Sequence, residues 1–322
     1  MPFEGINDTA TNNSWDYSGY GNNGKDNGPS ILWNATGGYD DKGAYMLDGL
    51  NGYIDVGSNE SFDMVSGKIT ISAWIKTTPS ALTQIIVSKR ATDGNADYQF
   101  NLQGNIIAYT FYEGGVMSGW TGNCSAGNGV TANKWYHAAV TFDDTTNSCV
   151  VYLNGVNNLA AGHGNQSYDI PVTTNADVWI GSQQHSSVKL PFNGTIDDVL
   201  IFNRSLSADQ IWNLFNNKTH EIDDNETRAG EYWNVTITPN DGSVDGAPLF
   251  SNTVKILNTP PTHATPILNT TNVTTNSTLT NLTAYNVSTA DVDNDLVKNI
   301  YNWMRNGTSI AVLNMPFEGI NN

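Results

Sequence analysis

The sequence has little charge, few basic residues and no long hydrophobic run. Charged residues make up 14% of its 322 residues, and 31 acidic against 14 basic residues give a formal net charge of −17. Nucleic acid and anionic lipid repel a surface of this sign, so we exclude both as partners. No apolar run reaches the roughly 20 residues of a membrane-spanning helix. No signal peptide is recognisable, as we expect of an internal piece of a longer precursor.

Cysteine is scarce, and histidine is not placed for metal or nucleophile chemistry. Cys124 and Cys149 either stay as two buried thiols or form a disulfide, which would close a loop of about 25 residues and add roughly 3 kcal/mol of stability. The histidines show no metal-ligand spacing and no pairing with a cysteine nucleophile. They are His137, His163, His185, His220 and His263. His137, within KWYHAAV, is expected to be a packed structural residue.

Asparagine, serine and threonine supply the polarity that charged residues do not. They form 17 Asn-X-Ser/Thr acceptors for N-linked glycans, more than a random order of these residues would produce. The acceptors are Asn7, Asn12, Asn34, Asn59, Asn123, Asn165, Asn193, Asn203, Asn217, Asn225, Asn234, Asn269, Asn272, Asn276, Asn281, Asn286 and Asn306. Any single acceptor can arise by chance in Asn- and Thr-rich strands. The excess nevertheless favours a secreted, glycosylated chain at the cell surface.

The heptapeptide MPFEGIN occurs twice, at residues 1–7 and at residues 315–321. Such an identity at both ends indicates one full period of a tandem array, followed by the opening of the next period. We therefore expect the chain to begin at a repeat boundary and to be one building block of a long extracellular polymer.

Short alternating runs separated by Gly, Asn and Asp turns between residues 40 and 203 are typical of an all-β domain. Strands are predicted at 44–47, 53–56, 68–76, 85–88, 98–103, 106–112, 135–143, 149–153, 178–181 and 195–202. A capping box of Ser207 and Gln210 opens a helix predicted over 207–216, with Ile211 and Leu214 on its apolar face. So many strands indicate two packed sheets in a jelly-roll sandwich.

Five motifs carry a family resemblance. They are PFEG with WDYSGYGNNG, then AYMLDGLNGYIDVG, KITISAWIK, NKWYHAAVTFDD with VVYLNGV, and WIGS leading to FNGTIDDVLIFNRSLSADQI. In this order they resemble the laminin G-like branch of the concanavalin A-like lectin superfamily, over residues 2–215. The resemblance implies a jelly-roll domain over 1–217. Trp74, Trp135 and Trp179 are interpreted as core between its two sheets.

The sequence pattern changes after the predicted helix. Strands are predicted at 232–238 and 252–257, followed by a stiff Thr-Pro-Pro-Thr joint at 259–262 and by further strands at 297–303 and 309–313. This region resembles the immunoglobulin-like and cadherin-like sandwiches of surface proteins. Together with the laminin G-like domain it points to a prokaryotic, archaeal surface protein.

Neither part of this region holds the seven strands of an immunoglobulin-like sandwich. We expect an immunoglobulin-like host shared between successive repeats, in which 218–258 closes one host, 259–314 opens the next, and 315–322 begins the next laminin G-like domain. Strand exchange joins the repeats if they are separate chains, because the exposed edge of an incomplete sandwich is a template for another strand. The alternative is a permuted sandwich within one copy.

Two acidic groups are candidate calcium sites, since hard cations prefer several carboxylate and carbonyl oxygens. The first comprises Glu4, Asp16, Asn22, Asp197 and Asp198. The family resemblance implies that their segments lie side by side, where laminin G-like relatives bind structural calcium. The second comprises Asp291, Asp293 and Asp295 with Asp241 and Asp245. The alternative for both groups is that Asp and Asn only form turns.

Sugar binding is a second implication of the resemblance. Lectin-like sites stack sugars on aromatic rings, and Trp15, Tyr20, Tyr112 and Trp120 lie in Gly-rich, loop-like settings. The alternative is that these rings shield a sheet edge or contact neighbouring subunits.

No catalytic arrangement is predicted. Glycanases of this superfamily place Glu and Asp at alternate positions of one strand, whereas 68–76 carries no acid. We predict a non-enzymatic repeat unit of an extracellular glycosylated filament, sheath or giant adhesin, stabilised by calcium and by identical neighbours. The competing hypothesis is a carbohydrate-binding adhesin module.

Overall fold

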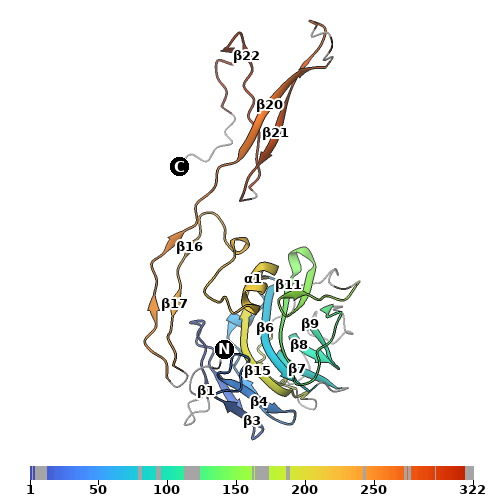
Figure 1. The fold of residues 1–322 in the computed structure, drawn as a ribbon, viewed down its shortest axis with the longest axis vertical. Helices are drawn as coiled ribbons and strands as arrows, with labels where there is room; N and C mark the ends of the chain where they lie inside the picture. Colours follow the sequence, from blue (N-terminus) through green and yellow to red (C-terminus); the bar gives the residue numbers. More distant parts are fainter. Residues whose placement is uncertain are drawn as a thin grey trace. The chain divides into compact units, whose positions relative to one another are not determined.

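The structure is a computed structural model that describes residues 1, 3, 13–78, 82–91, 96–111, 124–161, 163, 174–185, 189–241, 244–271, 274, 277–293 and 295–315. Contacts divide the chain into two units. The first unit holds Met1–Glu226 with Thr236–Phe250, and the second holds Thr227–Val235 with Ser251–Asn322. Figure 1 shows the strands of both units.

The first unit contains two antiparallel sheets packed face to face (Figure 1). The eight-stranded sheet has the order β1 (Asn13–Ser14), β2 (Gly24–Asn27), β5 (Tyr53–Asp55), β14 (Val178–Ile180), β7 (Thr83–Arg90), β8 (Ala96–Gln103), β9 (Ile106–Phe111) and β10 (Cys124–Ser125). The seven-stranded sheet has the order β13 (Val156–Asn157), β12 (Ser148–Leu153), β11 (Trp135–Asp143), β6 (Lys68–Thr77), β15 (Asn193–Phe202), β4 (Ala44–Asp48) and β3 (Ile31–Asn34). The predicted all-β jelly roll is confirmed.

Alternation along each strand builds the core between the sheets. In β6, Ile71, Ala73 and Ile75 are buried and pack inward, and Phe100 of β8 and Phe142 of β11 join them. The tryptophan between these inward residues, Trp74, must then lie on the opposite face of its sheet. A disulfide joins Cys124 of β10 to Cys149 of β12, which links the two sheets.

The assignment of the tryptophans to the inter-sheet core was wrong. Trp74 stacks on Tyr39 with ring centroids 4.0 Å apart, outside the core. Trp179 stacks on Tyr53 at 3.8 Å, and Trp135 lies under the Lys76 ammonium group. The prediction assumed that the largest apolar residues point into the core. Because side chains alternate along a strand, the inward positions beside Trp74 belong to Ala73 and Ile75.

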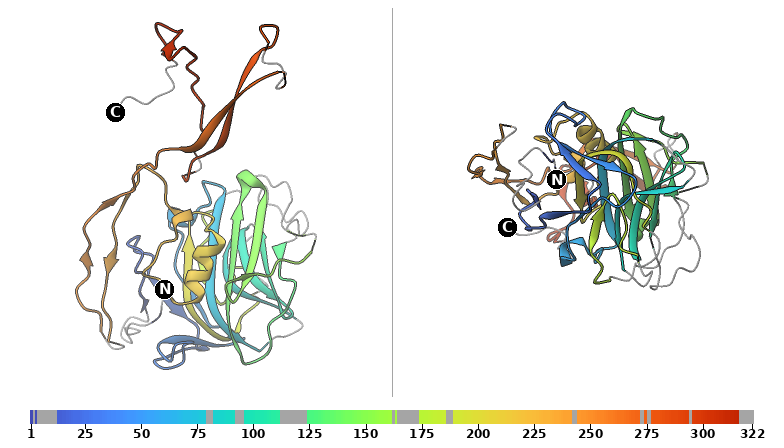
Figure 2. Two further views of the ribbon diagram at one scale, coloured as in Figure 1. Left: turned by 45° about the horizontal axis from the view of Figure 1, so that its top comes forward. Right: turned by 90° about the horizontal axis from the view of Figure 1, so that it is seen from below.

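One α-helix, α1 (Ala208–Phe215), covers the outer face of the seven-stranded sheet (Figure 2). The Ser207 hydroxyl caps it by accepting the N–H of Gln210, as the capping box predicts. Ile211 and Leu214 are buried against Ala139 and Tyr152 of β11 and β12, in a second small core. The described part of the unit also contains three short 3-10 helices: η1 (Glu60–Phe62), η2 (Asp144–Thr146) and η3 (Asp224–Glu226).

The strands beyond η3 pair only two at a time. The ladders are β16 (Tyr232–Trp233) with β19 (Val254–Lys255), β17 (Thr236–Ile237) with β18 (Leu249–Phe250), β20 (Thr262–Thr270) with β21 (Leu282–Ala290), and β22 (Met304–Arg305) with β23 (Thr308–Ser309). None of the described residues beyond Glu226 is buried. No strand forms at 297–303, contrary to prediction, because an apolar alternation becomes a strand only where a partner pairs with it.

Candidate functional site

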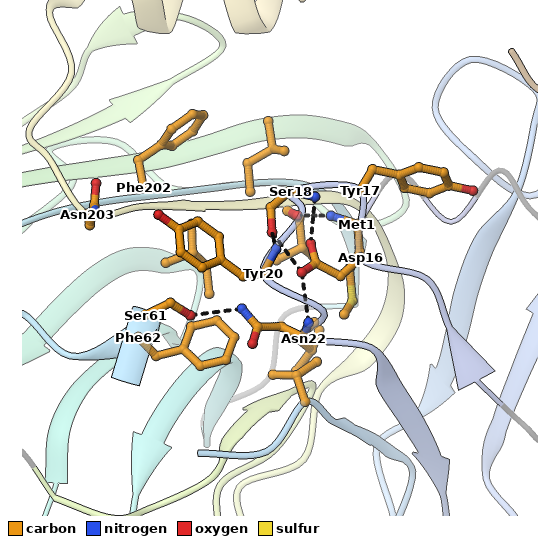
Figure 3. Close-up of a pocket in the computed structure, with 15 residues that line it drawn as sticks. Met1, Asp16, Tyr17, Ser18, Tyr20, Asn22, Ser61, Phe62, Phe202 and Asn203 are labelled. Carbon is orange, nitrogen blue, oxygen red and sulfur yellow. Dashed lines mark hydrogen bonds between the residues drawn. The ribbon is translucent and has the colours of Figure 1, made fainter. Parts of the chain in front are cut away.

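The described part of the first unit contains a pocket of about 400 Å³ beside the strand β15. Its wall is mostly apolar, and its polar groups come from the loop between β1 and β2 and from η1. The lining residues are Met1, Asp16, Tyr17, Ser18, Tyr20, Asn22, Val56, Ser61, Phe62, Ile180, Val199, Leu200, Ile201, Phe202 and Asn203 (Figure 3). Three residues that the sequence analysis singled out, Asp16, Tyr20 and Asn22, therefore come together here.

Asp16 shapes the polar side of the pocket. Its carboxylate accepts the N–H of Ser18 at 2.9 Å, the hydroxyl of Ser18 at 2.7 Å and the N–H of Asn22 at 2.9 Å. Burial raises the pKa of Asp16, but these hydrogen bonds outweigh burial and hold the pKa below its usual value. Asp16 is thus a charged residue that fixes the loop.

Asn22 offers an unused acceptor at the pocket. Its amide group donates to the hydroxyl of Ser61 at 2.9 Å, and its backbone N–H bonds Asp16 (Figure 3). The side chain is only 9% exposed, and its Oδ1 is buried without a hydrogen-bond partner. A ligand hydroxyl or a water molecule would satisfy this oxygen, since a buried unpaired acceptor costs about 1–3 kcal/mol.

Asp197 and Asp198 lie at a bulge in β15 next to Met1. The carboxylate of Asp197 is buried and accepts the N–H of Tyr39 at 3.2 Å and that of Asp198 at 2.8 Å. The register of β15 shifts between Asp197 and Leu200, and Asp198 has a φ of 47°, in the left-handed region. Burial raises the pKa of Asp198 to about 6, although the Met1 amino group lowers it.

The first segment of the chain lies beside β15 at Met1, as the resemblance implied. Met1 donates its amino group to the carbonyl of Val199 and accepts the N–H of Val199 at 3.1 Å. The charges of Asp198, Asp16 and Asp197 raise the pKa of this amine, but its burial is the larger effect and lowers the pKa overall. Glu4 lies outside the described residues.

These residues as placed do not fit a calcium ion. Within the described ranges, no group of three or more His, Cys, Asp or Glu could hold a metal ion. Calcium prefers six to eight oxygens, whereas the oxygens of Asp16 and Asp197 already accept N–H and O–H donors. Calcium at the first group stays a prediction of the family resemblance.

The second acidic group is divided between the units. Asp241 belongs to the first unit and accepts the N–H of Val244 at 2.9 Å, and Asp245 accepts the Tyr17 hydroxyl at 2.8 Å. In the second unit, Asp291 accepts the N–H of Asp293 at 2.8 Å and of Asp295 at 3.2 Å. Asp241 and Asp291 each close a turn, which is the alternative that the sequence left open, whereas Asp245 binds a tyrosine 228 positions away. Calcium at the second group also stays a prediction.

The four aromatic candidates for sugar binding have different outcomes. Tyr20 lines the pocket and is 61% exposed, whereas Trp15 is 45% exposed and does not line it. Tyr112 and Trp120 lie outside the described residues. The sequence did not connect Phe62, Ser61 and Asn203 with this pocket, because η1 and the residue after β15 reach it only in the folded chain.

Most described glycan acceptors are accessible. All of them are exposed except Asn34, which is half-buried. Asn7, Asn12, Asn123, Asn165, Asn272 and Asn276 fall outside the described residues. Among the described helices, none is long and apolar enough to cross a membrane.

A laminin G family model, described as the concanavalin A-like lectin/glucanases superfamily, matches residues 48–212, just over half of the chain. No curated protein matches the sequence.

Several solved structures are similar to parts of the chain. Domain 4 of AbnA, an extracellular arabinanase from Geobacillus stearothermophilus solved with arabinotriose, is 22% identical, with coverage of 58% of this chain and 82% of that chain and a TM-score of 0.39. The binding domain of botulinum neurotoxin serotype G is 19% identical, with coverage of 63% of this chain and 48% of that chain and a TM-score of 0.43. A Trypanosoma rangeli sialidase mutant is 15% identical, with coverage of 61% of this chain and 30% of that chain and a TM-score of 0.44. The chain thus spans less than half of the toxin and sialidase chains.

Proposed function

This chain belongs to the concanavalin A-like lectin/glucanase superfamily through residues 48–212, and on that premise we propose that it is a non-catalytic structural unit of an extracellular, glycosylated assembly built from copies of itself. The first unit is a finished β-sandwich with its own core. The described residues of the second unit form two-stranded ladders and none of them is buried, and the proposal rests on that contrast.

The observation that carries the proposal is the exposure of apolar side chains on β20 and β21. Ile267 and Leu268 on β20, and Leu282 and Tyr285 on β21, are each at least half exposed. No described residue of the second unit is buried. A two-stranded ladder alone is at best marginally stable in water, and each large apolar side chain that becomes buried contributes about 1.5–3 kcal/mol. A further sheet face is needed to cover these strands, and strands of another copy have the matching pattern.

Two features favour an extracellular site of assembly. A disulfide joins the two sheets, and disulfides persist mainly in oxidising compartments. The described acceptors for N-linked glycans are nearly all accessible. Glycans at these positions would limit lateral aggregation while leaving strand pairing along one direction open.

Association of the intact chain tests the proposal. Light scattering after gel filtration should show a mass that rises with protein concentration, and electron microscopy should show linear assemblies. The double substitution Ile267→Ser with Tyr285→Ser should weaken association, because these two residues face each other in the ladder. The matched control is Leu50→Ser, which changes an exposed leucine of the first unit. A chain that stays monomeric at high concentration would contradict the proposal.

Carbohydrate binding at the pocket is the second candidate, favoured by the unpaired Oδ1 of Asn22 next to the exposed ring of Tyr20. Sugars present hydroxyl donors and an apolar face, which suit this acceptor and this ring. Screening the intact chain on a glycan array tests the idea. Binding should be lost in Tyr20→Ala and kept in Trp15→Ala, whose ring is exposed outside the pocket.

A further inference from the structure

Met1 and Phe3 lie in a slot of the first unit, which we define by Trp33, Gly43, Tyr45 and Val199. Met1 forms two backbone hydrogen bonds with Val199, and the indole N–H of Trp33 donates to the carbonyl of Phe3 at 3.0 Å. The Phe3 side chain is only 5% exposed, and its ring meets the ring of Tyr45 edge to face at 4.9 Å. Phe3 therefore belongs to the core of the sandwich, and Met1 packs against that core.

The slot is specific for this segment in shape as well as in polarity. A Cβ on Gly43 would lie 2.0 Å from the carbonyl oxygen of Phe3, so only glycine allows the segment to approach so closely. Met1 is partly buried and packs against the same core as Phe3. A segment that fills the slot in this way needs a methionine and, two positions later, a phenylalanine.

Residues 315–321 repeat residues 1–7 letter for letter. They supply the same methionine and phenylalanine, as Met315 and Phe317, with the same intervening proline. Met315 is 57% exposed, in contrast to Met1. An identical sequence can make the same contacts in the same slot, and in one copy both segments cannot occupy it together.

We propose that residues 315–321 occupy, in a second copy of this chain, the slot that Met1 and Phe3 fill in the copy described here. Each copy then has one donor segment and one acceptor slot. A contact of this head-to-tail kind that does not close on itself produces an open linear array. The inference rests on the proposed function, and it names the partner as a second copy and the contact as this slot.

Matched phenylalanine substitutions in the intact chain test the exchange. Phe3→Asp disables the resident segment but leaves residues 315–321 able to fill the slots of other copies. Its Tm should rise with protein concentration by about 3 °C for each tenfold increase, since tenfold in a bound partner is about 1.4 kcal/mol. The double substitution Phe3→Asp with Phe317→Asp should show no such rise, and Phe317→Asp alone should keep the parent Tm.

A peptide supplies a second measurement in case Phe3→Asp does not fold by itself. An N-acetylated MPFEGIN peptide should raise the Tm of Phe3→Asp and suppress its dependence on protein concentration, whereas MPDEGIN should do neither. Equal melting of the single and double variants at every concentration, with no effect of the peptide, would overturn the exchange. If the parent chain still associates in that case, assembly uses β20 and β21 alone, and the proposed function stands without the slot.

Discussion

His137 of β11 lies directly opposite Trp74 of β6, and the centroids of their rings are 5.4 Å apart. Both residues are on the outer face of the seven-stranded sheet, where the ring of Phe215 from α1 covers them. The Nδ1 of His137 is buried without a hydrogen-bond partner. The histidine is packed as the sequence analysis expected, and its burial favours the neutral imidazole.

Acid should destabilise the fold through His137. Burial lowers the pKa of this imidazole from its usual 6.5 to about 4. As the pH falls, the unfolded chain binds the proton before the folded chain does. The contribution of neutral His137 to the free energy of unfolding is therefore fully present above pH 6.5. It is lost as the pH falls toward 4, by about 3 kcal/mol in total. Urea unfolding of His137→Phe from pH 7 to pH 4 should lack this loss. Parallel curves for parent and variant would contradict the assignment.

Asp198 should destabilise the folded chain at high pH, in contrast to His137, which destabilises it in acid. Its pKa is raised to about 6, mainly by burial, so its ionisation in the folded state is unfavourable. This cost is absent at acid pH and grows as the pH rises from about 4 to 6. Asp198→Asn, which tolerates the left-handed backbone at this position, should raise the free energy of unfolding at pH 8 by about 1–3 kcal/mol. The control is the same comparison at pH 4, where the two proteins should differ little.

Local signals in the sequence were sufficient for most of the first unit. The strand predicted at 135–143 is β11 to the residue, because turn-forming residues bound this largely apolar run on both sides. The capping box located α1 within one residue at each end. Spacing alone left the pairing of Cys124 with Cys149 open, because only the packing of β10 against β12 brings the two cysteines together.

The pocket and the slot could not be predicted from local pattern. Asn22 meets Ser61 across 39 positions, and Met1 meets Val199 across 198, so only the folded sheets bring them together. The resemblance did place the first segment beside β15, and its assignment of the nearby carboxylates to calcium stays a prediction. In the described residues, Asp16 and Asp197 accept backbone N–H groups.

Lys89 should be essential to the first unit through its carboxylate partners. Its ammonium group is fully buried and donates to Asp97 at 2.5 Å, to the carbonyl of Thr174 at 2.7 Å and to Asp63. Burial raises the pKa of Asp97, and Lys89 opposes this rise. Lys89→Met would leave a buried charge uncompensated and should cost about 3–5 kcal/mol.

The double substitution Lys89→Met with Asp97→Leu is the control for that effect. It removes both buried charges, so it should recover a large part of the stability lost in Lys89→Met. Urea unfolding of the four proteins gives the coupling energy. Additive losses would mean that the two residues do not act as a pair.

Gly43→Ala should loosen the first segment from its slot without touching the rest of the core. The added Cβ would meet the carbonyl oxygen of Phe3 at 2.0 Å and lie 3.1 Å from the Trp33 indole nitrogen, so the segment must shift. The expected cost is about 1–3 kcal/mol, the range for overpacking a well-packed site. Gly127→Ala is the matched control, because the nearest atom to its Cβ is 3.5 Å away.

Hydrogen exchange at Val199 measures the effect, because its backbone N–H donates to the Met1 carbonyl at 3.1 Å. Exchange of this N–H should become faster in Gly43→Ala and stay unchanged in Gly127→Ala. Equal protection in both variants would mean that the segment does not depend on this close approach.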